Sequence, residues 1–143
     1  MALIAAVIER LKVELGTTVA DVLPVEDLAS VSAGTAPRNG TVFVIPYREQ
    51  AEPNDLAMGG FEQLVHVQIL VALVLRRHAD VQGAQRALDF DTLKGAIEQA
   101  LAGWAVDPRG DLFELVSAQA APLGNGVTVY VQTWQTSRYL ETD

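Results

Sequence analysis

The sequence predicts an α+β fold in which helices pack on one face of a mostly antiparallel four-stranded sheet. Two segments have the hydrophobic period of a helix and four have that of a strand, in the order α-β-β-α-β-β. The chain has 143 residues, of which 50% are hydrophobic, and this length is typical of one domain with its own core. We therefore expect a single domain over residues 1–143, folded without disulfides because cysteine is absent.

The first helix is predicted over residues 3–15. Its apolar residues recur at the i, i+3, i+4 and i+7 positions of one stripe, namely Leu3, Ile4, Val7, Ile8, Leu11 and Leu15. Gly16 follows the last of them and is a suitable C-cap. Residues 17–40 contain several prolines and glycines, which indicates a surface connector with a short helical turn between residues 25 and 31.

The first two strands are predicted on either side of a long loop. Residues 41–45 are β-branched and aromatic and lie between Gly40 and Pro46. Residues 47–60 form a polar loop, well above the usual length of about 4–6 residues, and residues 61–77 form a long strand. Its odd-numbered positions from Val65 to Leu75 are apolar, but the even-numbered ones are also largely apolar. Something must therefore cover part of its second face.

The second half of the chain adds a helix and two strands. The apolar stripe of the helix consists of Leu93, Ala96, Ile97, Ala100, Leu101 and Trp104. Asp89 or Asp91 is expected at its N-terminus, where acidic residues are favoured. Residues 112–121 and 127–140 are the last two strands, joined at a Gly-Asn-Gly turn. In the final strand the apolar alternation shifts between Val131 and Trp134, which predicts a bulge there.

Charge and hydropathy exclude two classes of partner. The net charge is −8 and the only dense basic run is Arg76-Arg77-His78, so sequence-specific nucleic-acid binding is not expected. No segment approaches the roughly 18 consecutive apolar residues of a membrane span, so no membrane partner is expected. The first ten residues lack the basic start and cleavage site of a signal peptide. These observations predict a soluble, cytoplasmic protein.

No motif predicts a catalytic residue, a cofactor-binding residue or a metal site. His66 and His78 could bind a metal with Asp80, but their spacing favours ordinary histidines. The acids at 89 and 91 could hold a divalent cation or act as an acid/base pair, but a helix start explains them better. Ser117 and Ser137 have no recognisable base, so a serine nucleophile has little support.

Two further groups of residues leave alternatives open. The basic run at 76–78 could clamp an anion, but it fits better as a solubilising strand end or as a partner for a neighbouring acidic subunit. Four aromatic residues could line a ligand pocket, although core or interface positions are more common for them: Trp104, Tyr130, Trp134 and Tyr139.

Several segments together carry a resemblance to a known family. They are Ile4–Leu11, Phe61–Leu70, the run from Asp80 through Gly83 to Asp89, the run from Leu93 through Ile97 to Trp104 with Pro108, and Trp134–Leu140. The most distinctive piece is Leu-Ala-Gly-Trp-x-x-x-Pro at residues 101–108. With these segments the sequence resembles the phage tail terminator proteins of Mu-like phages and prophages.

The resemblance implies a virion structural protein with no catalytic residues. Subunits of this family form a hexameric ring that caps the tail tube, stops its elongation and provides the docking surface for the head. The implied partners are other copies of the chain, the tail tube protein and a head–tail connector protein. The implied location is the virion tail, and the host cytoplasm during assembly.

The residues themselves, rather than the resemblance, indicate where partners would bind. The long loop, the apolar second face of the long strand and the arginine pair after it give eight candidate contacts: Tyr47, Arg48, Asn54, Met58, Leu70, Val74, Arg76 and Arg77. If the second face binds a partner, aspartate at Leu70 or Val74 should break assembly and leave a folded monomer.

Two other functions remain as alternatives. The first is a small α+β enzyme or ligand-binding domain that acts as a dimer, and the second is another adaptor of the head–tail connector. An enzyme needs a deep pocket with converging polar groups and shifted pKa values, whereas a ring subunit does not.

Overall fold

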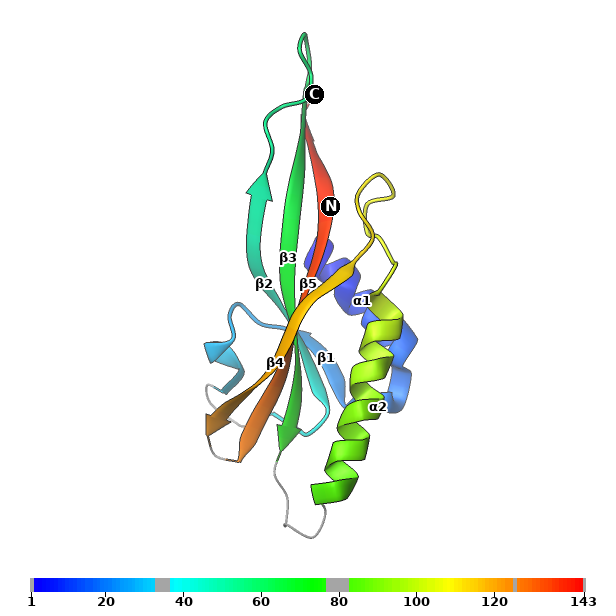
Figure 1. Cartoon of the computed structure of the whole chain (residues 1–143), viewed down its shortest axis with the longest axis vertical. Helices are drawn as coiled ribbons and strands as arrows, with labels where there is room; N and C mark the ends of the chain where they lie inside the picture. Colours follow the sequence, from blue (N-terminus) through cyan, green and yellow to red (C-terminus); the bar gives the residue numbers. More distant parts are fainter. Residues whose placement is uncertain (1, 33–36, 77–82, 125, 143) are drawn as a thin grey trace.

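A computed structural model describes residues 2–32, 37–76, 83–124 and 126–142. Its elements are α1 (Leu3–Leu15), η1 (Gly16–Thr18), β1 (Asp21–Pro24), η2 (Ala29–Ser32), β2 (Thr41–Ala51), β3 (Phe61–Arg76), α2 (Gly83–Leu101), β4 (Glu114–Gly124) and β5 (Val127–Thr142). The strands form one sheet in the order β1-β2-β3-β5-β4. The two longest strands, β3 and β5, lie side by side along the long axis of the molecule (Figure 1).

The predicted fold class is wrong. The chain is mostly β, with a mixed five-stranded sheet and only two helices, instead of four mostly antiparallel strands with helices on one face. The missing strand is β1, which pairs in parallel with the first residues of β2, from Asp21 opposite Thr41 to Pro24 opposite Val44. With four residues that include an aspartate and a proline, β1 has no periodic pattern by which a sequence could indicate it.

Both predicted helices exist, and one begins earlier than expected. The Leu3–Leu15 helix is confirmed, and the N–H of Gly16, whose φ is 52°, donates to the Lys12 carbonyl. The second helix begins at Gly83, so Asp89 and Asp91 lie within it and do not mark its start. Acidic side chains are common near helix N-termini, but this helix precedes them by more than one turn.

β2 extends beyond its prediction because of its place in the sheet. It continues through Pro46 to Ala51, so residues 47–51 are strand and only residues 52–60 are loop. β1 pairs with residues 41–44 alone, which leaves Pro46 on an edge. A proline is tolerated there because no neighbouring strand needs its missing N–H.

Two β-bulges lie at the same level on opposite sides of the central strand pair. The register of β2 shifts between Pro46 and Arg48 around Tyr47, and that of β4 shifts around Val116. Both flank one row of paired residues, which we call the waist: Pro46, Ile69, Trp134 and Leu115. The pairing of β3 with β5 is continuous, so the bulge predicted in the last strand is wrong. Bulges increase local twist, and the strands cross near the middle of Figure 1.

Each face of the sheet has its own core. The odd face carries the odd-numbered residues of β3 from Val65 to Leu73, which form one buried cluster with residues of α1 and α2. The even face carries Leu70, Ala72 and Val74, which cluster with β5 residues and with Val31 of the connector. The connector is therefore partly core, and the expectation that something covers the second face is confirmed. No helix in the described part of the chain is long and apolar enough to cross a membrane.

Candidate assembly surface

The sheet above the waist has one open face. This upper sheet comprises residues 47–51 of β2, 61–68 of β3 and 135–142 of β5, and it is the upper end in Figure 1. On its odd face Val65 and Val67 are buried, whereas residues 47–51 are all exposed. None of the described residues in the even-face core cluster belongs to the upper sheet. The even face is therefore covered below the waist, whereas above it this core does not continue and, of the described strands, only β5 is partly covered, at Ser137.

Polar side chains occupy the open even face. The Gln68 amide nitrogen donates to the Gln135 side-chain oxygen at 2.8 Å, on neighbouring strands. In the next row, His66 Nε2 lies 3.0 Å from Glu52 Oε2. These side chains satisfy one another's hydrogen-bonding groups and leave a polar surface beside the core. Such a surface suits a contact that excludes water only when a partner binds.

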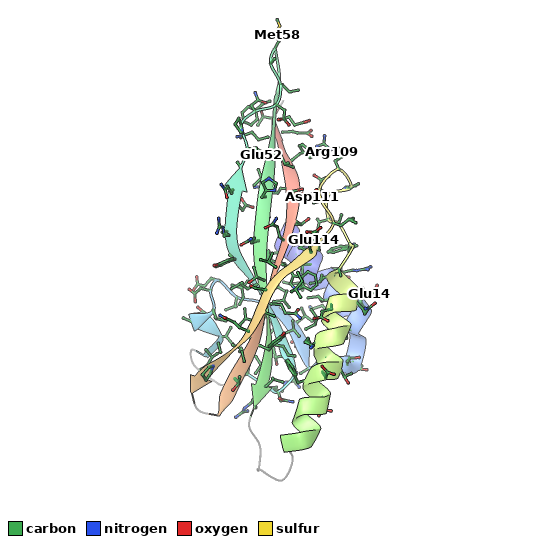
Figure 2. All side chains as sticks on the ribbon, viewed as in Figure 1. Glu14, Glu52, Met58, Arg109, Asp111 and Glu114 are labelled. Atoms are coloured by element: carbon green, nitrogen blue, oxygen red, sulfur yellow. The ribbon has the colours of Figure 1, made fainter. Side chains whose placement is uncertain are left out.

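The β2–β3 loop, residues 52–60, projects from the upper sheet, and we call it the tongue (Figure 1). Asn54 Oδ1 accepts the backbone N–H groups of Leu56 at 3.2 Å and Glu62 at 2.9 Å. The N–H of Asp55 donates to the Glu62 carbonyl at 2.9 Å. Met58 stands at the tip with 92% of its surface exposed (Figure 2). The tongue is therefore a hydrogen-bonded extension of the hairpin that presents an apolar tip.

A segment before β4 lies along the edge of β5 in the upper sheet. Asp107 Oδ1 accepts the N–H of Arg109 at 3.0 Å, and its Oδ2 accepts the N–H of Tyr139 at 3.3 Å. The pKa of the Asp107 carboxyl is lowered, chiefly by the hydrogen bond from the Arg109 N–H. The Tyr139 N–H and the Arg109 charge also lower this pKa, whereas burial opposes them. Asp111 donates its N–H to Ser137 Oγ at 2.7 Å. The free edge of β5 is thus covered by this segment.

Ion pairs connect the strands of the upper sheet. The Arg138 guanidinium on β5 donates two hydrogen bonds to the Glu49 carboxylate on β2, from Nε to Oε1 at 3.3 Å and from Nη2 to Oε2 at 3.0 Å. Arg109 contacts Glu62 and Glu141 and lies over the Tyr139 ring, 4.6 Å from its centroid. Exposed pairs of this kind each contribute little to stability, about 0–1 kcal/mol. Their effect is to fix the relative positions of the side chains on the surface.

Exposed apolar side chains gather in two places. The tongue and the upper sheet carry Tyr47, Leu56, Met58 and Leu140. The second place consists of Leu112, two residues before β4, and of Leu115 and Val116 at the start of β4. In the rest of the described chain, the large exposed apolar side chains are Val13 and Leu23. Contiguous exposed apolar surface is characteristic of interfaces, so these two places are the candidate assembly surface.

Four of the predicted contacts lie on the upper sheet and the tongue, at different levels. Tyr47 is the bulged, 56% exposed residue of β2, and Arg48 follows it on the exposed edge. Asn54 accepts two of the hydrogen bonds that hold the tongue, and Met58 lies at its tip. The second apolar place, around Leu115 and Val116, is not predicted from the sequence. A signal was available, because two adjacent apolar residues break the alternation of a strand and indicate a bulge.

The other predicted contacts lie elsewhere. Leu70 is 9% exposed and Val74 fully buried in the even-face core of the same chain, which corrects the expectation that aspartate there would leave a folded monomer. Arg76 lies at the far end of β3, where Asn39 Oδ1 accepts its N–H at 2.9 Å. Arg77, His78 and Asp80 lie outside the described residues.

The aromatic residues contribute to the core and do not converge on a pocket. Trp104 stacks on Phe113 with ring centroids 5.8 Å apart, and Tyr130 meets Phe90 edge-on. Trp134 is 1% exposed and donates its indole N–H to Gln132. Among the described residues, no group of three or more histidine or acidic side chains could hold a metal ion.

The comparison with family models identifies the family of this chain. The family model for phage tail terminator protein matches residues 2–142. The chain belongs to the phage tail terminator family. As a member, it is a virion structural protein of tail assembly. This agrees with an architecture in which most of the large exposed apolar residues lie at one end and along one edge, with Val13 and Leu23 elsewhere.

A solved structure shows the same fold. A chain in the virion of a native gene transfer agent (GTA) particle matches with a TM-score of 0.54 and 16% sequence identity. The match covers 99% of this tail terminator and 96% of that chain. The curated proteins gave no significant match.

Proposed function

We propose that this tail terminator forms a ring of six copies that caps the finished tail tube, stops its elongation and provides the docking surface for the head. In this role the chain acts by binding and has no catalytic activity. Its partners are other copies of itself, the tail tube protein and a head–tail connector protein. It would assemble in the host cytoplasm and remain in the virion. The closer relation to Mu-like phages rests on the sequence segments that carry that resemblance.

The main support is a pair of unlike surfaces on one chain. A closed ring needs a heterologous interface, in which one patch of each copy meets a different patch of the next. The tongue and the β4 edge are two such patches, on different elements of the same sheet. Both carry exposed apolar side chains, so each would gain by burial.

The middle of the β4 edge in particular lacks the usual protection. Residues 114–120 are all exposed, and β4 contains no lysine or arginine. No strand in the described part of the chain pairs with its outer side. Edge strands in monomers are typically shortened, charged or interrupted, as β1 is short and β2 carries Pro46, a bulge and Arg48. In β4 the bulge at Val116 and the register shift at Pro122 leave residues 117–121 between them as an uninterrupted, uncharged edge. The open β4 edge therefore favours pairing with another chain.

The overall charge suits a ring around DNA. With a net charge of −8, a ring of these subunits would repel the phosphate backbone and let DNA pass without adhering. Acidic subunits also repel each other, so the ring must be held by uncharged contacts and should assemble more readily as salt increases.

The test is solution mass by light scattering over a concentration series, with negative-stain images, alone and with tail tube protein. We expect closed rings of about six copies, alone or on tube ends, and shorter tubes when the protein is added during growth. The matched variants are Leu115→Asp on the β4 edge and Val13→Asp on α1, both at exposed apolar positions. The first should prevent rings and the second should not. A monomer or dimer that leaves tube growth unchanged would contradict the proposal.

A further inference from the structure

We infer that Met58 of one copy inserts into an uncharged groove at the waist of a second copy. This inference rests on the proposed ring and names one of its contacts. It concerns two features of the same chain, an exposed knob and a hole, that lie on different parts of the molecule.

The hole is a groove of about 300 Å³ on the even face, next to β4. Leu70 and Val131, both at least nine-tenths buried, line it together with Leu28 of the connector and Ala121 of β4. Its polar lining is uncharged and includes Ser117. The groove therefore offers apolar surface to an inserted side chain and hydroxyl groups to the backbone beside it.

The knob is Met58. Among the described residues it is the most exposed large hydrophobic side chain, at 92%, although hydrogen bonds of Asn54 and Asp55 hold the base of the tongue that carries it. Residues 56–60 are uncharged, and Gly59 and Gly60 have φ values of 67° and 77° that suit the tight turn behind the tip. An unbranched, polarizable methionine adapts to irregular apolar gaps. Holding such a side chain in solvent is unfavourable unless a partner buries it.

The knob cannot reach the groove of its own chain. Figure 2 shows Met58 at the tip, beyond Glu52 and the upper sheet, whereas Ser117 and Leu70 in the groove lie below the waist. The hydrogen bonds of Asn54 and Asp55 hold the tongue in line with β2 and β3. A second copy is therefore the occupant that supplies the matching knob.

Charge selects this groove among those in the described residues. A larger groove, of about 470 Å³, has Arg48, Glu49 and Arg138 in its lining. Two others include acidic residues, Asp89 in one and Asp111 with Glu114 in the other. An uncharged tip loses no ionic hydration when it enters an uncharged groove, and two acidic copies repel least where both surfaces are neutral. The contact joins unlike patches, so it repeats head to tail and can close a ring.

The absence of cysteine allows a direct test by disulfide cross-linking. Met58→Cys and Ser117→Cys are made as single variants and mixed under oxidising conditions, with and without tail tube protein. We expect a covalent dimer only in the mixture, and a ladder of covalent oligomers when both changes are in one chain. Val13→Cys mixed with Ser117→Cys is the control, because Val13 is also exposed but lies on α1.

Four outcomes would overturn the inference. Rings that form without the Met58–Ser117 cross-link would leave the proposed function intact and disprove this contact. Cross-linking of Met58→Cys to itself would show that tongues meet tip to tip. A photoreactive probe attached to the thiol of the Met58→Cys variant would assign the tongue to the tube if it labels only tube protein. If no rings form under either condition, both the contact and the proposed function fail.

A second set of variants measures the contribution of the knob. Met58→Asp should weaken ring assembly at least ten-fold, whereas Met58→Leu should keep assembly within about three-fold of the native protein, because it retains most of the buried apolar area. Both variants should melt at the native temperature, since Met58 supports no contact in the monomer core. Equal assembly of all three proteins would contradict the inference.

Discussion

The two halves of the long β3–β5 pair differ in what covers them, although one continuous register joins them. Below the waist, residues 69–74 of β3 are all buried, with a core on each face. Above the waist only Val65 and Val67 of β3 are buried, and the even face is polar and open. The strands alone therefore do not decide which part is core. The helices and the connector supply a core on both faces of the lower half, whereas no described helix or connector residue of the even-face core covers the upper half.

A charge in the lower half should have the greatest effect on stability. Val74→Asp places a carboxylate in the fully buried even-face core, with no cation described nearby in the cluster. We expect a loss of more than about 4 kcal/mol in the free energy of unfolding, enough to unfold the chain. Leu64→Asp, on the same face of the same strand above the waist, should cost less than about 1.5 kcal/mol. Urea titrations followed by circular dichroism compare them, and equal losses would refute the contrast between the halves.

The next effect concerns the segment that covers the edge of β5. A Cβ at Gly110 would overlap the Ser137 carbonyl oxygen and lie 3.0 Å from its carbonyl carbon. Gly110→Ala should therefore cost about 1–3 kcal/mol, because backbone on both sides must move. Gly95→Ala on α2 meets nothing within 4 Å and should instead stabilise by roughly 0.5–1 kcal/mol. Opposite signs in thermal melts are expected, and a neutral Gly110→Ala would mean that the segment is not held against β5.

A smaller effect depends on pH. The pKa of Asp107 is lowered below its ordinary 3.8 by backbone N–H donors, so its stabilisation is complete above that ordinary value. The contribution is lost as the pH falls through the lowered pKa of the folded state. Asp107→Asn should be less stable than the native protein at about pH 7 and should lose less stability between about pH 5 and pH 2. Parallel curves of urea midpoint against pH would contradict this role for Asp107.

The weakest effect is expected at the Arg138–Glu49 pair. Both side chains are partly exposed, so Arg138→Gln should cost less than about 1 kcal/mol, and added salt should reduce the difference. Denaturation in low and high salt measures it. A larger, salt-independent loss would show that this part of the upper sheet is packed as core.

Much of the fold is predictable because its longest elements carry periodic patterns. The Leu3–Leu15 stripe and the alternation from Val65 to Leu75 predict α1 and β3 closely. β1 could not be predicted, because a four-residue strand is specified by the neighbour that it meets and not by its own pattern. The shift at Trp134 does not indicate a bulge in β5. It marks the waist. Val131 belongs to the even-face core below the waist, whereas Trp134 belongs to the odd-face core.

The candidate surface is only half predictable. Tyr47, Arg48, Asn54 and Met58 share one stretch of sequence, so loop length and composition indicate them together. Leu70 and Val74 belong to an apolar face that could equally be core or interface, and only the position of Val31 and its neighbours decides between the two. The apolar even face of a strand indicates that something covers it, but not whether the cover is a distant segment of the same chain or a partner.

Amide hydrogen exchange, measured on the chain before and after assembly, can distinguish the two halves of the sheet residue by residue. The lower sheet should be complete in the monomer, whereas the tongue and the β4 edge should become buried on assembly. We expect new protection at residues 52–60 and 114–121, and none at residues 69–74, which should already be protected. Unchanged exchange at both surfaces in the assembled protein, or new protection confined to the lower sheet, would contradict the account.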